Sequence, residues 1–206
     1  MQYKLTPIAS ILIALFCSLS SLAFAEDTMR NAFIGKADKS IEGILGFAVS
    51  SGGDELGKVH LVNNSGDTST ESIEAGGLWY IYGGVQIATP AFPLRLTLGY
   101  FEDGVNAKNG SVSFSRIPVE LLGVFSNGTH TVALGPTYHL SPKLDMDDAG
   151  YGSYEADDAL GMVLMYEYTV SDRYALGVRY TSISYDFGGS ENANGDNLGV
   201  MIEFKF

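Results

Sequence analysis

The last nine residues of the chain, LGVMIEFKF, constrain its fold most. Every second position is apolar, and this row consists of Leu198, Val200, Ile202, Phe204 and Phe206. The positions between them hold glycine, methionine, glutamate and lysine. Successive side chains of a β-strand point to opposite faces, so this pattern predicts a strand with one apolar and one polar face. Because the chain ends on an exposed aromatic residue and begins with an export signal, we expect the apolar face to meet lipid.

The first 25 residues have the three parts of a secretory signal peptide. Lys4 supplies the positive start, and residues 8–15 form an apolar run. This run is shorter than the roughly 18–20 residues of a membrane-spanning helix. Ala23 and Ala25 fit a cleavage site, so we predict that the signal peptide, residues 1–25, is removed after Ala25. Cleavage would also remove Cys17, the only cysteine, and leave a chain without disulfide bonds.

Clusters of glycine, asparagine, aspartate, proline and serine divide the remaining chain into eight predicted strands. They lie at 40–50, 73–89, 94–102, 111–126, 130–140, 159–170, 174–187 and 198–206. Short and long connections alternate between them, as in barrels with short periplasmic turns and longer extracellular loops. The sequence therefore predicts an all-β fold, an eight-stranded antiparallel up-and-down transmembrane β-barrel at 40–206. Residues 26–39 would form an N-terminal periplasmic segment.

Seven charged residues fall on the inner face of the predicted strands. They are Glu42, Arg95, Glu120, Glu167, Arg179, Glu203 and Lys205. Buried charges persist when they are paired, and an eight-stranded barrel is just wide enough for side chains to fill it. We therefore interpret this set as an ion-paired plug, with Arg179 near Glu167 and Glu203, and Lys205 near Glu42. A narrow, cation-preferring, porin-like pore is the alternative interpretation.

The predicted long loops carry most of the negative charge of the chain, whose formal net charge is −12. The loop at 141–158 alone contains six acidic residues and one lysine. Within it, Asp145, Asp147 and Asp148 resemble the start of a calcium loop, but the spacing that follows fails. We expect no bound metal or other cofactor, with weak cation binding at these three aspartates as the alternative. An acidic rim also argues against nucleic acid as a partner.

Two features suggest lipid chemistry as an alternative function. Pro118 and Pro136 remove backbone donors from adjacent strands, and the turn near 127–129 would place Pro118 opposite Thr137. Palmitoyltransferase barrels of the outer membrane resemble this arrangement, in which a weakened seam admits lipid. His139 and Ser141 resemble the His-x-Ser pair of outer-membrane lipid A deacylases, with Glu155 as the candidate carboxylate. That family has asparagine after the serine, where this chain has proline.

The carboxy-terminal strand carries the most specific resemblance to a known family. Its pattern resembles the assembly signal of outer-membrane barrels, and the residues that carry it are Asn197, Gly199, Ile202, Phe204 and Phe206. The chain thus resembles the small outer-membrane β-barrel family of the OmpA/OmpX-like eight-stranded type. The resemblance implies escort by periplasmic chaperones and insertion by the barrel assembly machinery. It does not fix one activity, because a fold can host many functions.

These observations lead to one leading hypothesis. We expect a monomeric, non-enzymatic protein of the Gram-negative cell outer membrane, surrounded by lipid and lipopolysaccharide. It would contribute to envelope integrity or to surface interactions through its acidic extracellular loops. A lipid-modifying enzyme that acts on acyl chains of lipid A or phospholipid, the pore described above and a soluble periplasmic lipocalin-like binder are the alternatives.

Overall fold

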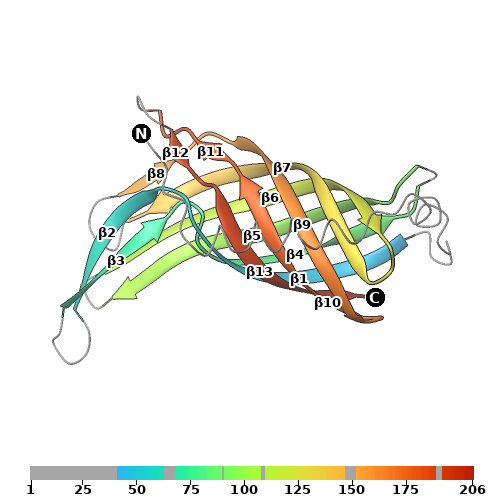
Figure 1. Ribbon diagram of the computed structural model, residues 1–206. Coiled ribbons are helices and arrows are strands. Elements are labelled where there is room, and N and C mark those ends of the chain that lie inside the picture. Colours follow the sequence, from blue (N-terminus) through green and yellow to red (C-terminus); the bar gives the residue numbers. More distant parts are fainter. Residues whose placement is uncertain (1–40, 63–67, 90, 108–109, 147–151, 189–191) are drawn as a thin grey trace, which may run out of the picture. The chain divides into compact units, whose positions relative to one another are not determined.

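A computed structural model describes residues 41–206, except 63–67, 90, 108–109, 147–151 and 189–191, and leaves the side chains of 57–62, 68–71, 105–107 and 110 undescribed. The predicted signal peptide, its cleavage site and the segment 26–39 therefore lie outside the described residues. All regular elements in the described part are strands (Figure 1). They are β1 (Ile41–Ser51), β2 (Glu55–Val62), β3 (Thr68–Glu74), β4 (Leu78–Ile87), β5 (Leu94–Ala107), β6 (Gly110–Ser126), β7 (His130–Asp145), β8 (Ser153–Glu155), β9 (Ala159–Ser171), β10 (Tyr174–Ser182), β11 (Ser184–Tyr185), β12 (Ala193–Asn194) and β13 (Asn197–Lys205).

Eight of these strands form a closed antiparallel sheet. Its order is β6-β5-β4-β1-β13-β10-β9-β7, and β7 pairs back with β6. The first and last strands meet along a continuous register, from Ile44 opposite Lys205 to Ser51 opposite Leu198. Phe206 extends this seam, because its backbone N–H and C=O both bond with Gly43. The predicted eight-stranded up-and-down barrel is therefore confirmed.

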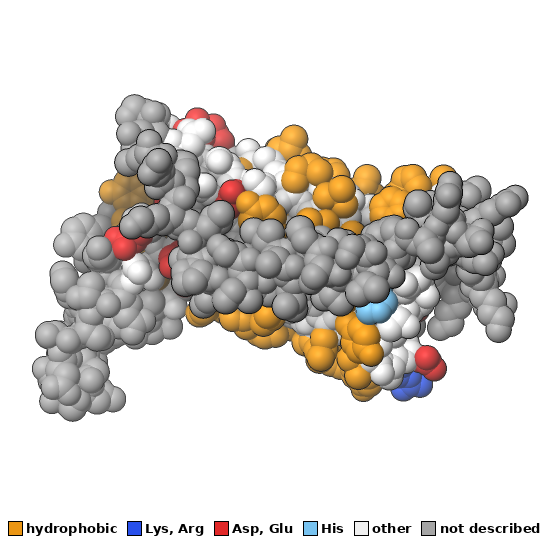
Figure 2. Space-filling model, in the orientation of Figure 1, with side chains coloured by type: hydrophobic (Ala, Val, Ile, Leu, Met, Phe, Trp, Pro, Cys, Tyr) orange, Lys and Arg blue, Asp and Glu red, His pale blue; other side chains and the backbone are white. Residues whose placement is uncertain are grey.

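Each of the eight strands presents large apolar side chains on its outer face. Examples from different parts of the ring are Phe47, Leu98, Leu134, Leu176 and Val200, each at least 43% exposed. Figure 2 shows such side chains spread along the barrel on the visible face. Exposed aromatic residues stand near the limits of the outward apolar rows, among them Tyr168 and Tyr174 at one limit and Tyr100, Tyr138 and Tyr180 at the other. No helix long and apolar enough to cross a membrane occurs in the described ranges.

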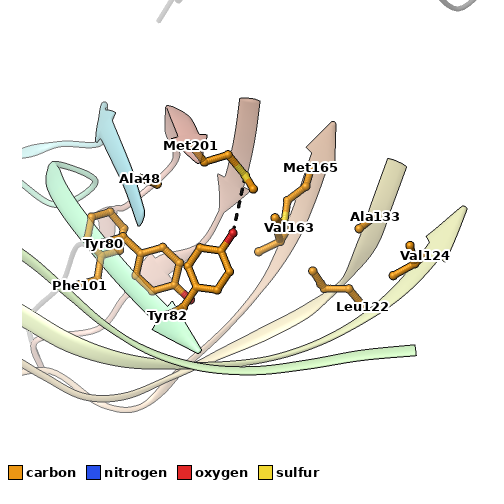
Figure 3. Close-up of a cluster of buried hydrophobic side chains, with 10 residues drawn as sticks. All are labelled: Ala48, Tyr80, Tyr82, Phe101, Leu122, Val124, Ala133, Val163, Met165 and Met201. Atoms are coloured by element: carbon orange, nitrogen blue, oxygen red, sulfur yellow. Dashed lines mark hydrogen bonds between the residues drawn. The ribbon is translucent and has the colours of Figure 1, made fainter. Parts of the chain in front are cut away.

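The inner face is filled by side chains from most of the wall. One cluster of buried apolar residues combines Ala48, Tyr80, Tyr82, Phe101, Leu122, Val124, Ala133, Val163, Met165 and Met201 (Figure 3). The rings of Tyr80 and Tyr82 are stacked, with centroids 5.0 Å apart. The alternation along the strands explains this filling, since successive side chains of a strand point to opposite faces and every second one enters the lumen.

The wall continues beyond the apolar band at the end opposite the short turns, which the sequence does not predict. Residues 51–72, expected as a loop, contain β2 and most of β3, which form a hairpin. β5 and β6 remain paired as far as Ala107 and Gly110, so the predicted loop at 103–110 is mostly strand. The predicted second strand at 73–89 is divided between β3 and β4. In the predicted loop at 141–158, β7 runs on to Asp145 and pairs with β8.

The predicted strand at 174–187 is interrupted at Ile183. β10 ends at Ser182, and the chain leaves the barrel wall to form the short β11, which pairs with β12. Ile183 and Tyr185 are buried there in a second apolar cluster. This cluster also contains Phe114 of β6 and Leu144 of β7. It therefore lies between the parts of these strands that extend beyond the apolar band.

Replacing Gly46 with alanine is expected to destabilise the barrel by about 1–3 kcal/mol through overpacking. A Cβ atom at Gly46 would lie 2.0–2.3 Å from the ring and hydroxyl of Tyr82, which donates a hydrogen bond to Glu203. Gly83→Ala is the matched control, because its Cβ would meet no atom closer than 3.8 Å. Urea unfolding in detergent micelles measures both, and equal stabilities for the two variants would contradict this packing.

Candidate functional site

The most densely bonded polar group in the barrel is an ion cluster around Arg95, near the short turns. The Arg95 guanidinium forms an ion pair with Glu167 and a second one with Glu203 at 3.0 Å. It also donates to the side-chain oxygen of Gln86 at 3.1 Å. Lys205 completes the cluster, with its Nζ 3.4 Å from Glu167 and 3.8 Å from Glu203. Two bases thus face two acids, and all except Lys205 and Gln86 are fully buried.

A second ion pair lies further along the interior. Arg179 forms a two-pronged contact with Glu120, one prong of which is 3.1 Å long. Thr97 and Thr137 donate their hydroxyls to the same carboxylate, at 3.0 and 3.3 Å. The Arg179 guanidinium also lies 4.7 Å from the centre of the Tyr80 ring, within the range of a cation–π contact. Every oxygen of the buried Glu120 carboxylate therefore has a donor.

The pairing in these clusters differs from the predicted one. Arg179 bonds with Glu120 rather than with Glu167 or Glu203, and Lys205 reaches Glu167 and Glu203 rather than Glu42. Glu42 is half-buried at the start of β1. The bonded side chains cross the lumen: β6 and β10, which carry Glu120 and Arg179, are not neighbours in the sheet. Strand patterns identify the inner face but not which residues meet across it.

Sequence reasoning missed the neutral members of these clusters. Tyr82, Gln86, Thr97 and Thr137 all bond to a buried ion. One signal was present: Gln86 stands directly opposite Arg95 in the β4–β5 register, on the same face. A polar residue beside a charge on the inner face is a candidate partner, because buried polar groups need hydrogen bonds.

Arg116 lies farther from the short turns than the two ion clusters, among aromatic rings. Its guanidinium is 3.7 Å from the Phe101 ring centre and 4.7 Å from that of Phe114. It also donates to the backbone oxygen of Gly77 at 3.3 Å. Nearby, His139 Nδ1 lies 2.7 Å from the hydroxyl of Tyr185, and burial raises the pKa of that phenol. Phe114 and Tyr185 belong to the second apolar cluster. Aromatic side chains around Arg116 therefore fill this part of the interior.

The candidate catalytic residues are not arranged as a triad. His139 is fully buried and bonded to Tyr185, whereas Ser141 and Glu155 are exposed. The backbone of Ser141 has a positive φ of 48°, and its N–H donates to Asp158 at 2.9 Å. Glu155 pairs with Lys143 through the β7–β8 ladder. In the described residues, no hydrogen bond joins any two of these three side chains, so His139 is not placed as the base for Ser141.

The two prolines do not face each other. Pro118 pairs with His139 in β7 and is buried, whereas Pro136 pairs with Met162 on the β9 side and is exposed. The three-residue turn between Ser126 and His130 shifts the register by two residues from the predicted one. The β6–β7 ladder continues on both sides of Pro118, but it has a bulge between Ser115 and Ile117 and no pairs at Leu121 and Leu122, which stand opposite Pro136 and Gly135. The predicted facing of the two prolines is therefore wrong, and the opening of this seam to lipid stays a prediction.

The residues of the predicted assembly signal lie along the closing strand β13. Asn197 is buried, and its side chain donates to the backbone oxygen of Gly195 at 3.0 Å. Gly199 packs against Ser50, and the Phe204 ring stands edge-on to Tyr174 with centroids 5.0 Å apart. Ile202 is half-buried, and Phe206 is 72% exposed. Recognition of this strand by assembly factors stays a prediction.

The candidate cation site is only partly described. Asp145 forms an ion pair with Lys143 at 2.7 Å, whereas Asp147 and Asp148 lie outside the described residues. Across the described ranges, no group of three histidine, cysteine or acidic side chains is placed to hold a metal ion.

Comparison with known proteins gives likeness in structure only. No protein-family model matches the chain, and no curated protein matches it. A similar solved structure is Ail, the attachment invasion locus protein of Yersinia pestis, in complex with the heparin analogue sucrose octasulfate, which is 10% identical with a TM-score of 0.50. That match covers 81% of this chain and 97% of Ail. At this identity the likeness shows the fold alone.

Two further structures are similar at lower scores. Neisserial surface protein A is 13% identical over 82% of this chain and 98% of its own, with a TM-score of 0.49. The outer membrane protein AlkL, solved in lipid bilayers, is 12% identical over 84% of this chain and 93% of its own, with a TM-score of 0.42. The closed eight-stranded sheet and the likeness to Ail give the chain the fold of the small eight-stranded outer-membrane barrels.

Proposed function

We propose that the protein is a monomeric, non-enzymatic and non-conducting barrel of the Gram-negative outer membrane. In this proposal the signal peptide is cleaved after Ala25, and periplasmic chaperones and the barrel assembly machinery insert the chain. Its extended strands and acidic loops face the cell exterior and contribute to envelope integrity or surface interaction, beside lipid and lipopolysaccharide.

The outer surface of the barrel carries this proposal. All eight wall strands present exposed apolar side chains, including Leu98 at 58%, Leu160 at 70% and Val200 at 65%. A soluble barrel would place such rows inside, but here the inside holds the ion pairs of Arg95 and Arg179. Closed barrels that span membranes show this inversion, with an apolar band outside and polar residues within.

The filled interior favours a structural role over a pore. The Arg95 cluster, the Arg179–Glu120 pair and the first apolar cluster all occupy the lumen. Each buried charge in the two ion clusters already has a partner, so passing ions would have to break these pairs. The positions of His139 and Ser141 likewise lend no support to a lipid-modifying enzyme.

Planar-bilayer recordings test the absence of conduction. We expect no conductance steps after insertion of the refolded protein, because the ion clusters and apolar side chains fill the lumen. The double variant Arg179→Ala with Glu120→Ala removes the second ion pair and serves as the comparison, since it shortens two large side chains in the lumen. Reproducible cation-selective steps from the unaltered protein would contradict the proposal and favour the pore.

A further inference from the structure

Two cavities lie against one segment of the wall, residues 155–162. The cavity farther from the short turns, called the upper cavity, has a volume of about 620 Å³ and is lined partly by Glu155, Asp157 and Asp158. The lower cavity, of about 410 Å³, is lined partly by Leu160 and Met162. Both open on the outer surface, because most of the side chains that line them are exposed. Only Ala159 separates the parts of the segment that line the two cavities.

The upper cavity is polar and lies at the edge of the apolar band. Its lining includes the exposed Tyr100 and Ile117. The hydroxyl residues Ser115 and Ser141 and the bases Arg116 and Lys143 also line it. Three carboxylates, of Glu155, Asp157 and Asp158, line it as well. Asp158 is fixed in place, because it accepts the Ser141 N–H at 2.9 Å and the Tyr138 hydroxyl at 3.3 Å.

The lower cavity is mainly apolar and lies where the β9–β10 ladder ends. β10 ends at Ser182, opposite Met162, and the next backbone bond to this segment is from Asp157 N–H to the Asp186 oxygen, at 2.9 Å. Pro136, Leu160, Met162 and Ile183 line the notch that remains, together with Ser182 and Ser184. Leu160 is 70% exposed and stands opposite Tyr138, one of the aromatic residues at this end of the band.

A polar cavity and an apolar notch that follow each other along residues 155–162 suit one amphiphilic molecule. Carboxylates outnumber bases in the upper cavity, which favours a positive group there. The two serine hydroxyls, and Lys143 beside its Asp145 partner, supply donors for a negative group nearby. The notch opens on the surface that the proposed function assigns to lipid, so an acyl chain is its natural occupant.

We propose that residues 155–162 form a binding site for a single lipid whose headgroup carries both a phosphate and an amine. The ammonium lies among Glu155, Asp157 and Asp158, the phosphate lies near Lys143 and Ser141, and one acyl chain lies in the notch beside Leu160 and Met162. This inference rests on the proposed function, because it requires this surface to meet lipid.

Native mass spectrometry of the refolded protein tests the site with phosphatidylethanolamine and phosphatidylglycerol of identical acyl chains. We expect one retained phosphatidylethanolamine, bound about tenfold more tightly than phosphatidylglycerol, as the loss of a charge-assisted contact would predict. The variant Glu155→Gln with Asp157→Asn should abolish this preference. Glu42→Gln with Asp172→Asn removes the same charge at the opposite end of the barrel and should leave it unchanged.

A second pair of variants tests the notch. Ser182→Phe fills it and should weaken the retention of both lipids, whereas Leu98→Phe adds a similar ring elsewhere on the exposed surface and should not. Each variant is first examined for a migration shift between unboiled and boiled gel samples. Equal retention of both lipids by a protein that shows this shift would overturn the site and leave the membrane barrel standing. Absence of the shift, with folding in plain buffer, would overturn both.

Discussion

Replacing Arg95 with methionine is expected to destabilise the barrel by about 3–5 kcal/mol, the usual cost of removing one partner from a buried ion cluster. Arg95 contacts two fully buried carboxylates, Glu167 and Glu203. Methionine keeps much of the volume but supplies no charge and no donors, so Lys205 alone would face both acids. Urea unfolding in detergent micelles, followed by the fluorescence of Trp79, measures the difference in the free energy of unfolding.

A compensated variant separates the loss of charge pairing from the loss of packing. Arg95→Met combined with Glu167→Gln and Glu203→Gln removes the uncompensated charges and should recover most of the lost stability. Lys205→Met should cost less than Arg95→Met, because Lys205 is partly exposed and its contacts are longer, at 3.4 and 3.8 Å. An Arg95→Met variant as stable as the unaltered protein would show that the interior ion cluster does not hold the barrel together.

Replacing Leu98 with arginine is expected to cost about 2–4 kcal/mol in a bilayer, the range for a charge near the middle of the lipid face of a barrel. Leu98 is 58% exposed and lies on β5 between Leu96 and Tyr100, within the outward apolar row. In water an exposed leucine tolerates this change. Urea unfolding from phospholipid vesicles measures the cost.

The control for this variant is Ser153→Arg, an exposed position in β8 beyond the apolar band. It should change stability by less than about 0.5 kcal/mol, as exposed substitutions away from special features usually do. A Leu98→Arg variant as stable as this control would place the outer surface in water and favour the soluble lipocalin-like alternative.

The sequence was sufficient for the barrel wall because lipid and lumen impose opposite demands on alternate residues. Leu96 and Leu98 point outward while Arg95 and Thr97 are buried, as the alternation in β5 predicts. The same rule fails beyond the apolar band. The sequences of β2 and β3 are mostly polar and show no clear alternation of apolar and polar residues, so the pattern does not predict these strands.

The partners inside the barrel could not be predicted from periodicity. Glu120 and Arg179 meet across the lumen, and their pairing depends on strand tilt and stagger, which no single strand encodes. The proline prediction failed for a related reason. A register error of two residues at the turn before His130 is enough to move Pro118 from Thr137 to His139.

Gel migration of the refolded protein with and without boiling tests the central claim, that the apolar rows face lipid and the ion pairs lie within. Closed membrane barrels resist detergent until they are heated. We predict that the protein folds only with detergent or lipid and that the unboiled and boiled samples migrate differently. Folding in plain buffer with identical migration of the two samples would contradict it.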